Sequence, residues 1–99
     1  MIFQLEFSPE AKAQLARLKH FPNLEKRYNA VRKALSLLQT NPRHPGLNTH
    51  PFESFVGPRG EKIFEAYAEN NTPGAYRIFF SYGPGRRVIS ILTVLPHPD

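Results

Sequence analysis

Two hydrophobic periods divide the first part of the chain. Residues 2–7 place three large apolar side chains on one face, which is the two-residue period of a half-buried strand. Residues 8–10, Ser-Pro-Glu, supply a side-chain cap, a proline where no amide hydrogen is needed and an acid, and so predict a helix start. Apolar residues then recur at helical spacing up to residue 18 and again over 24–38, with Pro22 between the two runs. The pattern predicts a strand followed by a helical hairpin.

Strand patterns dominate the second half of the chain. Residues 41–51 carry three prolines, a glycine and two histidines, which predicts an ordered loop. Residues 83–87, Gly-Pro-Gly-Arg-Arg, predict a tight turn between the two most apolar segments. The predicted strands are 52–56, 61–69, 76–82 and 88–95.

This order of elements predicts an α+β domain. It has an N-terminal strand, a helical hairpin and then a three- to four-stranded antiparallel sheet that the helices cover on one face. If the apolar residues of 76–82 face the helices, alternation places Arg77 and Phe79 on the opposite, partly open face. Glu65 and Tyr67 of the preceding strand share that face. A charged and aromatic surface is therefore expected there.

Composition narrows the class of protein. The 99 residues, 40% hydrophobic and without a long apolar run, indicate one domain spanning 1–99 and no membrane segment. The absence of cysteine excludes disulfides and cysteine-based zinc sites. Because residues 1–7 lack the basic start and apolar stretch of a signal peptide, we expect a cytoplasmic protein. A net charge of +5 favours an anionic partner, either nucleic acid or an acidic protein.

Short motifs carry a family resemblance over nearly the whole chain. They are the helix-ending Asn41-Pro42, the segment 62–67 (Lys-Ile-Phe-Glu-Ala-Tyr), the segment 76–80 (Tyr-Arg-Ile-Phe-Phe), and the order strand, two helices, three strands. In these features the chain resembles the RelE/ParE toxin superfamily. The resemblance implies a small basic toxin of a bacterial toxin–antitoxin pair, with an acidic antitoxin protein as partner. Most members cut messenger RNA on the ribosome, whereas the ParE branch poisons DNA gyrase.

The resemblance also implies roles for individual residues. Arg77 matches by motif the arginine that contacts the scissile phosphate, and His97 matches by position the general acid that ends the last strand in the YoeB-like branch. That branch has a glutamate base before its third strand, where this chain has a loop with His50 and no acid. The RelE branch uses paired lysines on the strand before the arginine, and here only Lys62 is present.

The chemistry of metal-independent RNA cleavage indicates the same residues as candidates for catalysis. The reaction needs a base for a ribose 2′-hydroxyl, a cation for the phosphate and an acid for the leaving oxygen. Histidine suits either proton role, so His97 and His50 are candidate acid and base, and Glu65 is an alternative base. A cross-strand ion pair with Arg77 is a competing use of Glu65. An exposed pair of this kind contributes only about 0–1 kcal/mol to stability.

Further candidates could bind the RNA backbone or bases. Arg86 and Arg87 follow the tight turn and could bind phosphates, although charged turns also serve solubility. Tyr67 and Phe79 could stack on bases or pack against cross-strand neighbours. Four basic residues lie off the apolar stripe of the second helix and predict a basic outer face: Lys26, Arg27, Arg32 and Lys33. The four histidines lack metal-ligand spacing, so neither a metal nor another cofactor is expected.

We therefore interpret the sequence as a metal-independent mRNA endoribonuclease toxin that acts on ribosome-bound message. One alternative is a ParE-like gyrase inhibitor, in which the helical hairpin and not the sheet would be the working surface. The other is a degenerate member of the superfamily that only binds its antitoxin.

Overall fold

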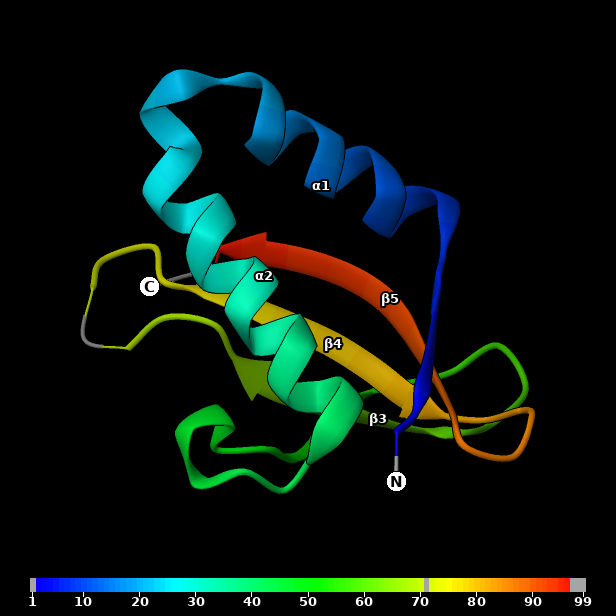
Figure 1. Ribbon diagram of the computed structural model, residues 1–99. Coiled ribbons are helices and arrows are strands. Elements are labelled where there is room, and N and C mark those ends of the chain that lie inside the picture. Colours follow the sequence, from blue (N-terminus) through cyan, green and yellow to red (C-terminus); the bar gives the residue numbers. More distant parts are fainter. Residues whose placement is uncertain (1, 71, 97–99) are drawn as a thin grey trace.

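Seven helices and strands make up the fold. The computed structural model describes residues 2–70 and 72–96, shown in Figure 1. The elements are β1 (Gln4–Phe7), α1 (Pro9–His20), α2 (Glu25–Thr40), β2 (His50–Val56), β3 (Lys62–Tyr67), β4 (Tyr76–Tyr82) and β5 (Val88–Pro96). Short 3₁₀ turns at Pro22–Leu24 and Pro45–Leu47 precede α2 and β2. No helix in the described ranges is long and apolar enough to cross a membrane.

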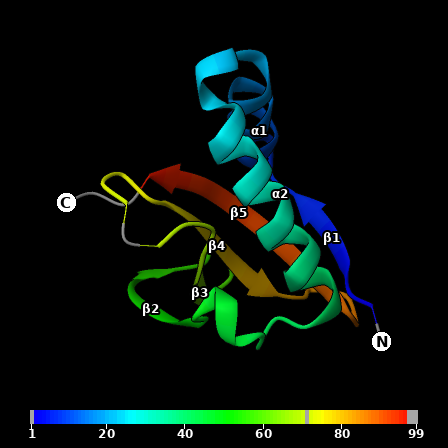
Figure 2. The same cartoon turned by 60° about the vertical axis from the view of Figure 1, so that its left-hand side comes forward.

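The strands form one sheet in the order β1-β5-β4-β3-β2. β1 runs parallel to β5, and every other neighbouring pair is antiparallel. Both helices lie on the same side of this sheet, as Figures 1 and 2 show from two directions. The predicted α+β fold is confirmed. The sheet has five strands because β1 joins its edge and all four later strands pair.

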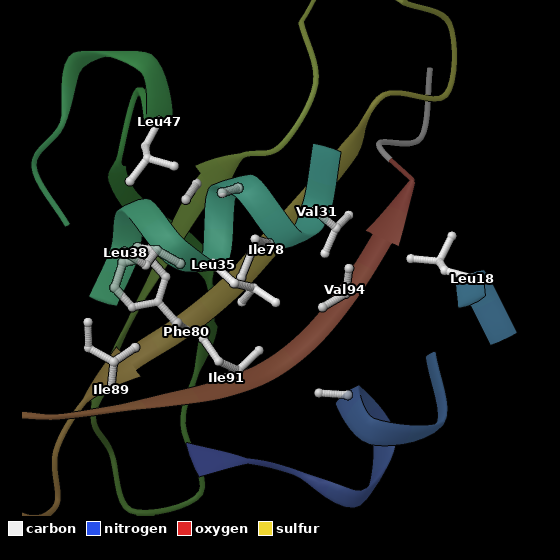
Figure 3. Close-up of a cluster of buried hydrophobic side chains, with 13 residues drawn as sticks. Leu18, Val31, Leu35, Leu38, Leu47, Ile78, Phe80, Ile89, Ile91 and Val94 are labelled. Atoms are coloured by element: carbon white, nitrogen blue, oxygen red, sulfur yellow. The ribbon is translucent and has the colours of Figure 1, made fainter. Parts of the chain in front are cut away.

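The hydrophobic core fills the space between the helices and the sheet (Figure 3). Alternation along β4 buries Ile78 and Phe80 completely, as the sequence predicts. Removing such side chains from water stabilises the fold by about 1.5–3 kcal/mol each. The other large residues of this core are Leu18, Val31, Leu35, Leu38, Leu47, Ile89, Ile91 and Val94.

Side chains of α1 replace a missing strand beside β5. β1 ends opposite Ile91, so the rest of β5 has no strand neighbour on that side. The Ser8 hydroxyl caps α1 by accepting the Ala11 amide hydrogen at 2.9 Å, and it donates to the Leu92 carbonyl at 2.7 Å. The Gln14 carboxamide accepts the Val94 amide hydrogen. These contacts fix α1 to the last strand and satisfy its free edge.

β2 partly covers the sheet face opposite the helices. Its first residue is His50, so the strand begins inside the segment that the sequence predicts as loop. Pairing with β3 shifts register between Pro51 and Val56. The Phe52 ring reaches across β3 to the Phe79 ring of β4, with the ring centres 4.9 Å apart. The face predicted to be partly open is therefore more enclosed over β3 and β4 than the sequence indicates.

Arg27 differs from its predicted place on the outer face of α2. Its guanidinium donates to the carbonyls of Gly74 (2.7 Å) and Pro73 (3.2 Å) and contacts the Glu69 carboxylate at 3.1 Å. Glu69 in turn accepts the Tyr76 amide hydrogen. The prediction of an outward Arg27 is wrong because the loop between β3 and β4 reaches back to α2 and surrounds this side chain with acceptors.

We expect Ser8→Ala to lower the free energy of unfolding by about 2 kcal/mol, because it removes both the helix cap and the bond to β5. Urea denaturation followed by circular dichroism measures this change. Ser36→Ala, at an exposed position of α2, is the matched control and should change stability by less than about 0.5 kcal/mol. Equal effects of the two substitutions would contradict a special role for Ser8.

Candidate functional site

Three neighbouring strands bring four of the predicted residues together on the face away from the helices. Arg77 of β4 lies opposite Tyr67 of β3, and Glu65 of β3 lies opposite His50 of β2. These four residues are called the Glu65 cluster below. Strand alternation explains their common face, since Glu65 and Tyr67 are two residues apart and Ile78, next to Arg77, points into the core.

The Glu65 carboxylate lies at the centre of the cluster. Its side chain is only 6% exposed, and its Oε1 atom is 2.8 Å from Nε2 of His50. Oε2 lies 3.7 Å from Nε of Arg77, which is an ion-pair distance without a hydrogen bond. The predicted pair of Glu65 and Arg77 is therefore present. It is diagonal and buried, not exposed, so removing one partner should cost more stability than it would at a surface pair.

The Arg77 guanidinium is packed in the fold. Its Nη1 donates to the Glu69 carbonyl at 2.7 Å and approaches the Tyr76 carbonyl at 3.4 Å. Its central carbon lies 3.6 Å from the centre of the Tyr67 ring, which places the cation on the aromatic face. The prediction that Arg77 lies exposed on the open face is therefore wrong. Its side chain is only 10% exposed, because Tyr67 and Glu65 surround it. Nη2 makes no hydrogen bond within the described chain and, unlike Nε, is not a buried atom, so this nitrogen is left to contact a ligand.

The contacts of His50 fix which ring nitrogen exchanges protons. Nδ1 is 2.7 Å from the Asn48 carbonyl, and a carbonyl only accepts, so Nδ1 carries a hydrogen. Nε2 faces Glu65, where it donates when the ring is charged; when the ring is neutral, Nε2 can only accept, so the shared proton must then be carried by the Glu65 carboxyl. The ring is 38% exposed and packs edge-on against Tyr67. Both base candidates therefore meet at one proton position between Nε2 and Oε1.

The predicted RNA-binding residues lie in different places. Phe79 packs against Phe52. Of its two predicted uses, base stacking and packing against a neighbouring strand, the structure therefore shows the second. Lys62 is exposed at the start of β3, and alternation turns it to the opposite side of the strand from Glu65. Arg86 is exposed, and the Arg87 guanidinium lies 5.0 Å from the Phe3 ring centre. Both arginines follow the end of β4 that is remote from Arg77.

His97 lies outside the described residues. The described end of β5 nevertheless runs beside the cluster, because Leu95 is paired with Arg77 and Pro96 with Tyr76. The strand that precedes His97 therefore ends next to the candidate site. Among the described residues, no group of three or more histidine, aspartate or glutamate side chains is arranged to hold a metal ion.

Backbone carbonyls are the part of the cluster that sequence reasoning missed. The Asn48 carbonyl orients His50, and the Glu69 carbonyl orients Arg77. Every residue has a carbonyl, so no residue type indicates this role. The contact between the Arg77 cation and the Tyr67 ring could have been predicted, since Tyr67 and Arg77 lie on strands that the sequence predicts to be neighbours.

We expect Glu65→Gln and Arg77→Met each to lower the free energy of unfolding by about 3 kcal/mol, because each leaves a buried charge without its partner. The double variant should lose less than the sum, by at least about 1 kcal/mol. Urea denaturation of all four proteins measures this coupling. The exposed controls Glu53→Gln and Arg32→Met should each change stability by less than about 0.5 kcal/mol. Additive effects would show that the two groups do not interact.

We also expect neutral His50 to carry its hydrogen on Nδ1, because that atom faces the Asn48 carbonyl. Nitrogen-15 NMR of the imidazole rings in alkaline solution distinguishes the two tautomers. His20 is the control, since its exposed ring has no hydrogen bond in the described structure and should show both tautomers. A hydrogen found on Nε2 of neutral His50 would contradict the arrangement described here.

The fold is shared with structures of known toxins. No protein-family model and no curated protein sequence matches this chain. The YoeB dimer from Staphylococcus aureus is similar with a TM-score of 0.70 at 13% identity, covering 99% of this chain and 100% of that chain. The archaeal RelE–RelB complex from Pyrococcus horikoshii gives 0.64 at 16% identity, covering 97% and 96%. The YoeB/ParE toxin from Agrobacterium tumefaciens gives 0.71 at 6% identity, covering 96% and 99%. The resemblance seen in the motifs is confirmed at the level of structure: the chain has the fold of the RelE/ParE toxin superfamily.

Proposed function

We propose that this protein is the toxin of a toxin–antitoxin pair and that it cuts messenger RNA on the ribosome without a metal ion. The Glu65 cluster is the observation that carries the proposal. It joins an imidazole, a carboxylate and a guanidinium whose Nη2 has no hydrogen bond in the described chain, all on one face of the sheet. The fold, which is similar to RelE and YoeB structures, supports the same reading.

The proposed reaction is attack of a ribose 2′-oxygen on the adjacent phosphorus. The bond from phosphorus to the 5′-oxygen breaks, leaving a 2′,3′-cyclic phosphate and a 5′-hydroxyl. Nε2 of His50, or Glu65 behind it, takes the proton from the 2′-hydroxyl. His97 gives a proton to the leaving 5′-oxygen, a role supported by the end of β5 beside Arg77.

Arg77 is proposed to bind the phosphate through Nη2, the nitrogen of its guanidinium that is neither hydrogen-bonded nor buried in the described chain. Negative charge grows on the phosphate oxygens during the reaction, and a fixed guanidinium stabilises it. Nε is buried and faces the Glu65 carboxylate at 3.7 Å, so it stays beside that carboxylate when Nη2 contacts the phosphate.

An acidic antitoxin is the proposed protein partner. The net charge of +5 would attract it, and one of the similar structures is a RelE–RelB complex. The same charge favours ribosome-bound message as substrate, and we place the protein in the cytoplasm, where both are found.

A second candidate function is supported by the packing of the cluster. Arg77 and Glu65 are buried and bound to each other, as in a purely structural ion pair. A ParE-like inhibitor of DNA gyrase, acting through the helical hairpin, needs no catalytic group on the sheet. A degenerate member that only binds its antitoxin fits the same observation.

The deciding experiment adds the protein to a translating extract, maps message ends by primer extension and assays gyrase supercoiling in parallel. We expect new ends within codons, unchanged by EDTA, and unaffected supercoiling. Loss of supercoiling activity with intact message would establish a gyrase inhibitor. If neither message cleavage nor loss of supercoiling is seen, the protein that only binds its antitoxin is the remaining function.

The same assay tests the residues. We expect Arg77→Lys, His50→Gln and His97→Gln each to slow cleavage at least about tenfold. Arg77→Lys is preferred to alanine because it retains a charge beside buried Glu65. Thermal unfolding checks that each variant is folded, and Arg32→Lys on exposed α2 is the control. Full activity of the three folded variants would remove the site assignment.

A further inference from the structure

A hollow of about 510 Å³ lies beside the Glu65 cluster, at the loop that leads into β2. This volume falls within the range of about 300–1,000 Å³ that is usual for small-molecule sites. The hollow, called the loop hollow below, is lined among others by Arg43, His44, Thr49, His50, Phe64 and Tyr82. Phe64 lies on the helix-facing side of β3, so the hollow opens on a different side of the sheet from Arg77.

The polar groups of the loop hollow are mainly donors. No aspartate or glutamate lines it. The Arg43 side chain is exposed and has no hydrogen bond or ion pair within the described structure. His44 accepts the Gly46 amide hydrogen on Nδ1, so its Nε2 carries a hydrogen and can donate. The site therefore suits a ligand that is anionic and rich in acceptors.

Tyr82 supplies an aromatic surface in the same hollow. Its ring packs edge-on against Phe64 and Phe80, with ring centres 5.2 and 5.6 Å away, and lies 6.2 Å from the Phe3 ring, yet the residue remains 41% exposed. Burial raises the pKa of the Tyr82 hydroxyl, and the Arg43 charge opposes this only in part. The hydroxyl thus stays protonated at neutral pH and can donate. An exposed ring beside a free guanidinium matches a base together with its phosphate.

His50 connects the loop hollow to the candidate site. It lines the hollow and also contacts Glu65 through Nε2. A nucleic-acid strand that crosses the edge of β2 at His50 would pass from the loop hollow to the Glu65 cluster. An acidic peptide would also be attracted by Arg43, but it offers no flat base for Tyr82.

We propose that the loop hollow binds one nucleotide of single-stranded RNA, next to the position that is cut, with its base on Tyr82 and its phosphate on Arg43. This inference rests on the proposed nuclease function and adds a substrate-binding site to it. The hollow would fix the position of the RNA, whereas the cluster would carry out the chemistry.

The test is the binding of a fluorescein-labelled 2′-O-methyl RNA dodecamer, followed by anisotropy at several salt concentrations. The methyl groups block the attacking oxygen, so binding is read without cleavage. Arg43→Ala should weaken binding at least about fivefold and reduce the salt slope by about 0.7, the value for one phosphate contact on a single strand. Tyr82→Leu should weaken binding at least about fivefold, and Tyr82→Phe, which keeps the ring, should bind within about threefold of the unsubstituted protein.

Arg32→Ala is the matched control, because it removes the same charge from the exposed face of α2. Arg43→Ala also keeps the test decisive if Tyr82→Leu fails to fold, since the Arg43 side chain supports no described contact. The proposal is overturned if the unsubstituted protein does not bind the RNA, or if Arg43→Ala and Arg32→Ala bind equally. It is also overturned if a glutamate-rich peptide binds more tightly than RNA and depends on Arg43.

The translating-extract assay separates this inference from the function on which it rests. If Arg43→Ala and Tyr82→Leu leave message cleavage unchanged, the RNA-binding role of the loop hollow is rejected and the nuclease function is retained. If RNA binding depends on Arg43 but message is not cleaved, the nuclease function is rejected and the RNA-binding role of the loop hollow is retained.

Discussion

The burial of one carboxylate constrains this half of the sheet. Glu65 lies beside β2 in the sheet with almost no access to water, and an ionised carboxylate in such a place needs compensating charge and hydrogen bonds. Arg77 supplies the compensating charge from the central strand, and Nε2 of His50 on the edge strand lies at hydrogen-bond distance from the carboxylate. The registers of β2, β3 and β4 are therefore linked through a single side chain, because a shift of one residue in any of them would turn its partner to the other face.

The same constraint explains why Arg77 is both buried and incompletely bonded. Two backbone carbonyls hold one end of the guanidinium, and the Tyr67 ring supports its plane. The opposite end faces Glu65 at a distance too long for a hydrogen bond. A cation fixed in this way keeps its orientation without water, which is what stabilisation of a developing charge requires. In the proposed mechanism, different atoms of this one side chain would hold the fold together and bind the phosphate.

Much of the fold follows from the sequence because periodicity reports burial directly. The alternation around Ile78 and the cap at Ser8 are local signals, and the structure confirms both. The sequence also places Glu65 and Arg77 on one face. It could not reveal that they are buried, because Arg77 packs on the Tyr67 ring and Glu65 contacts His50, which the sequence places in a loop and not on a neighbouring strand. The position of Arg27 was predicted wrongly for a similar reason, since its partners are carbonyls of a loop that is distant in the sequence.

The double use of the Ser8 hydroxyl has a mechanical consequence. One oxygen starts α1 and also holds the carbonyl of Leu92, and Gln14 repeats the attachment six residues further along the chain. α1 and the last strand are therefore fastened at two points. A protein that pulled α1 away from the sheet would have to break both attachments to β5, the strand that continues to the end paired with Arg77.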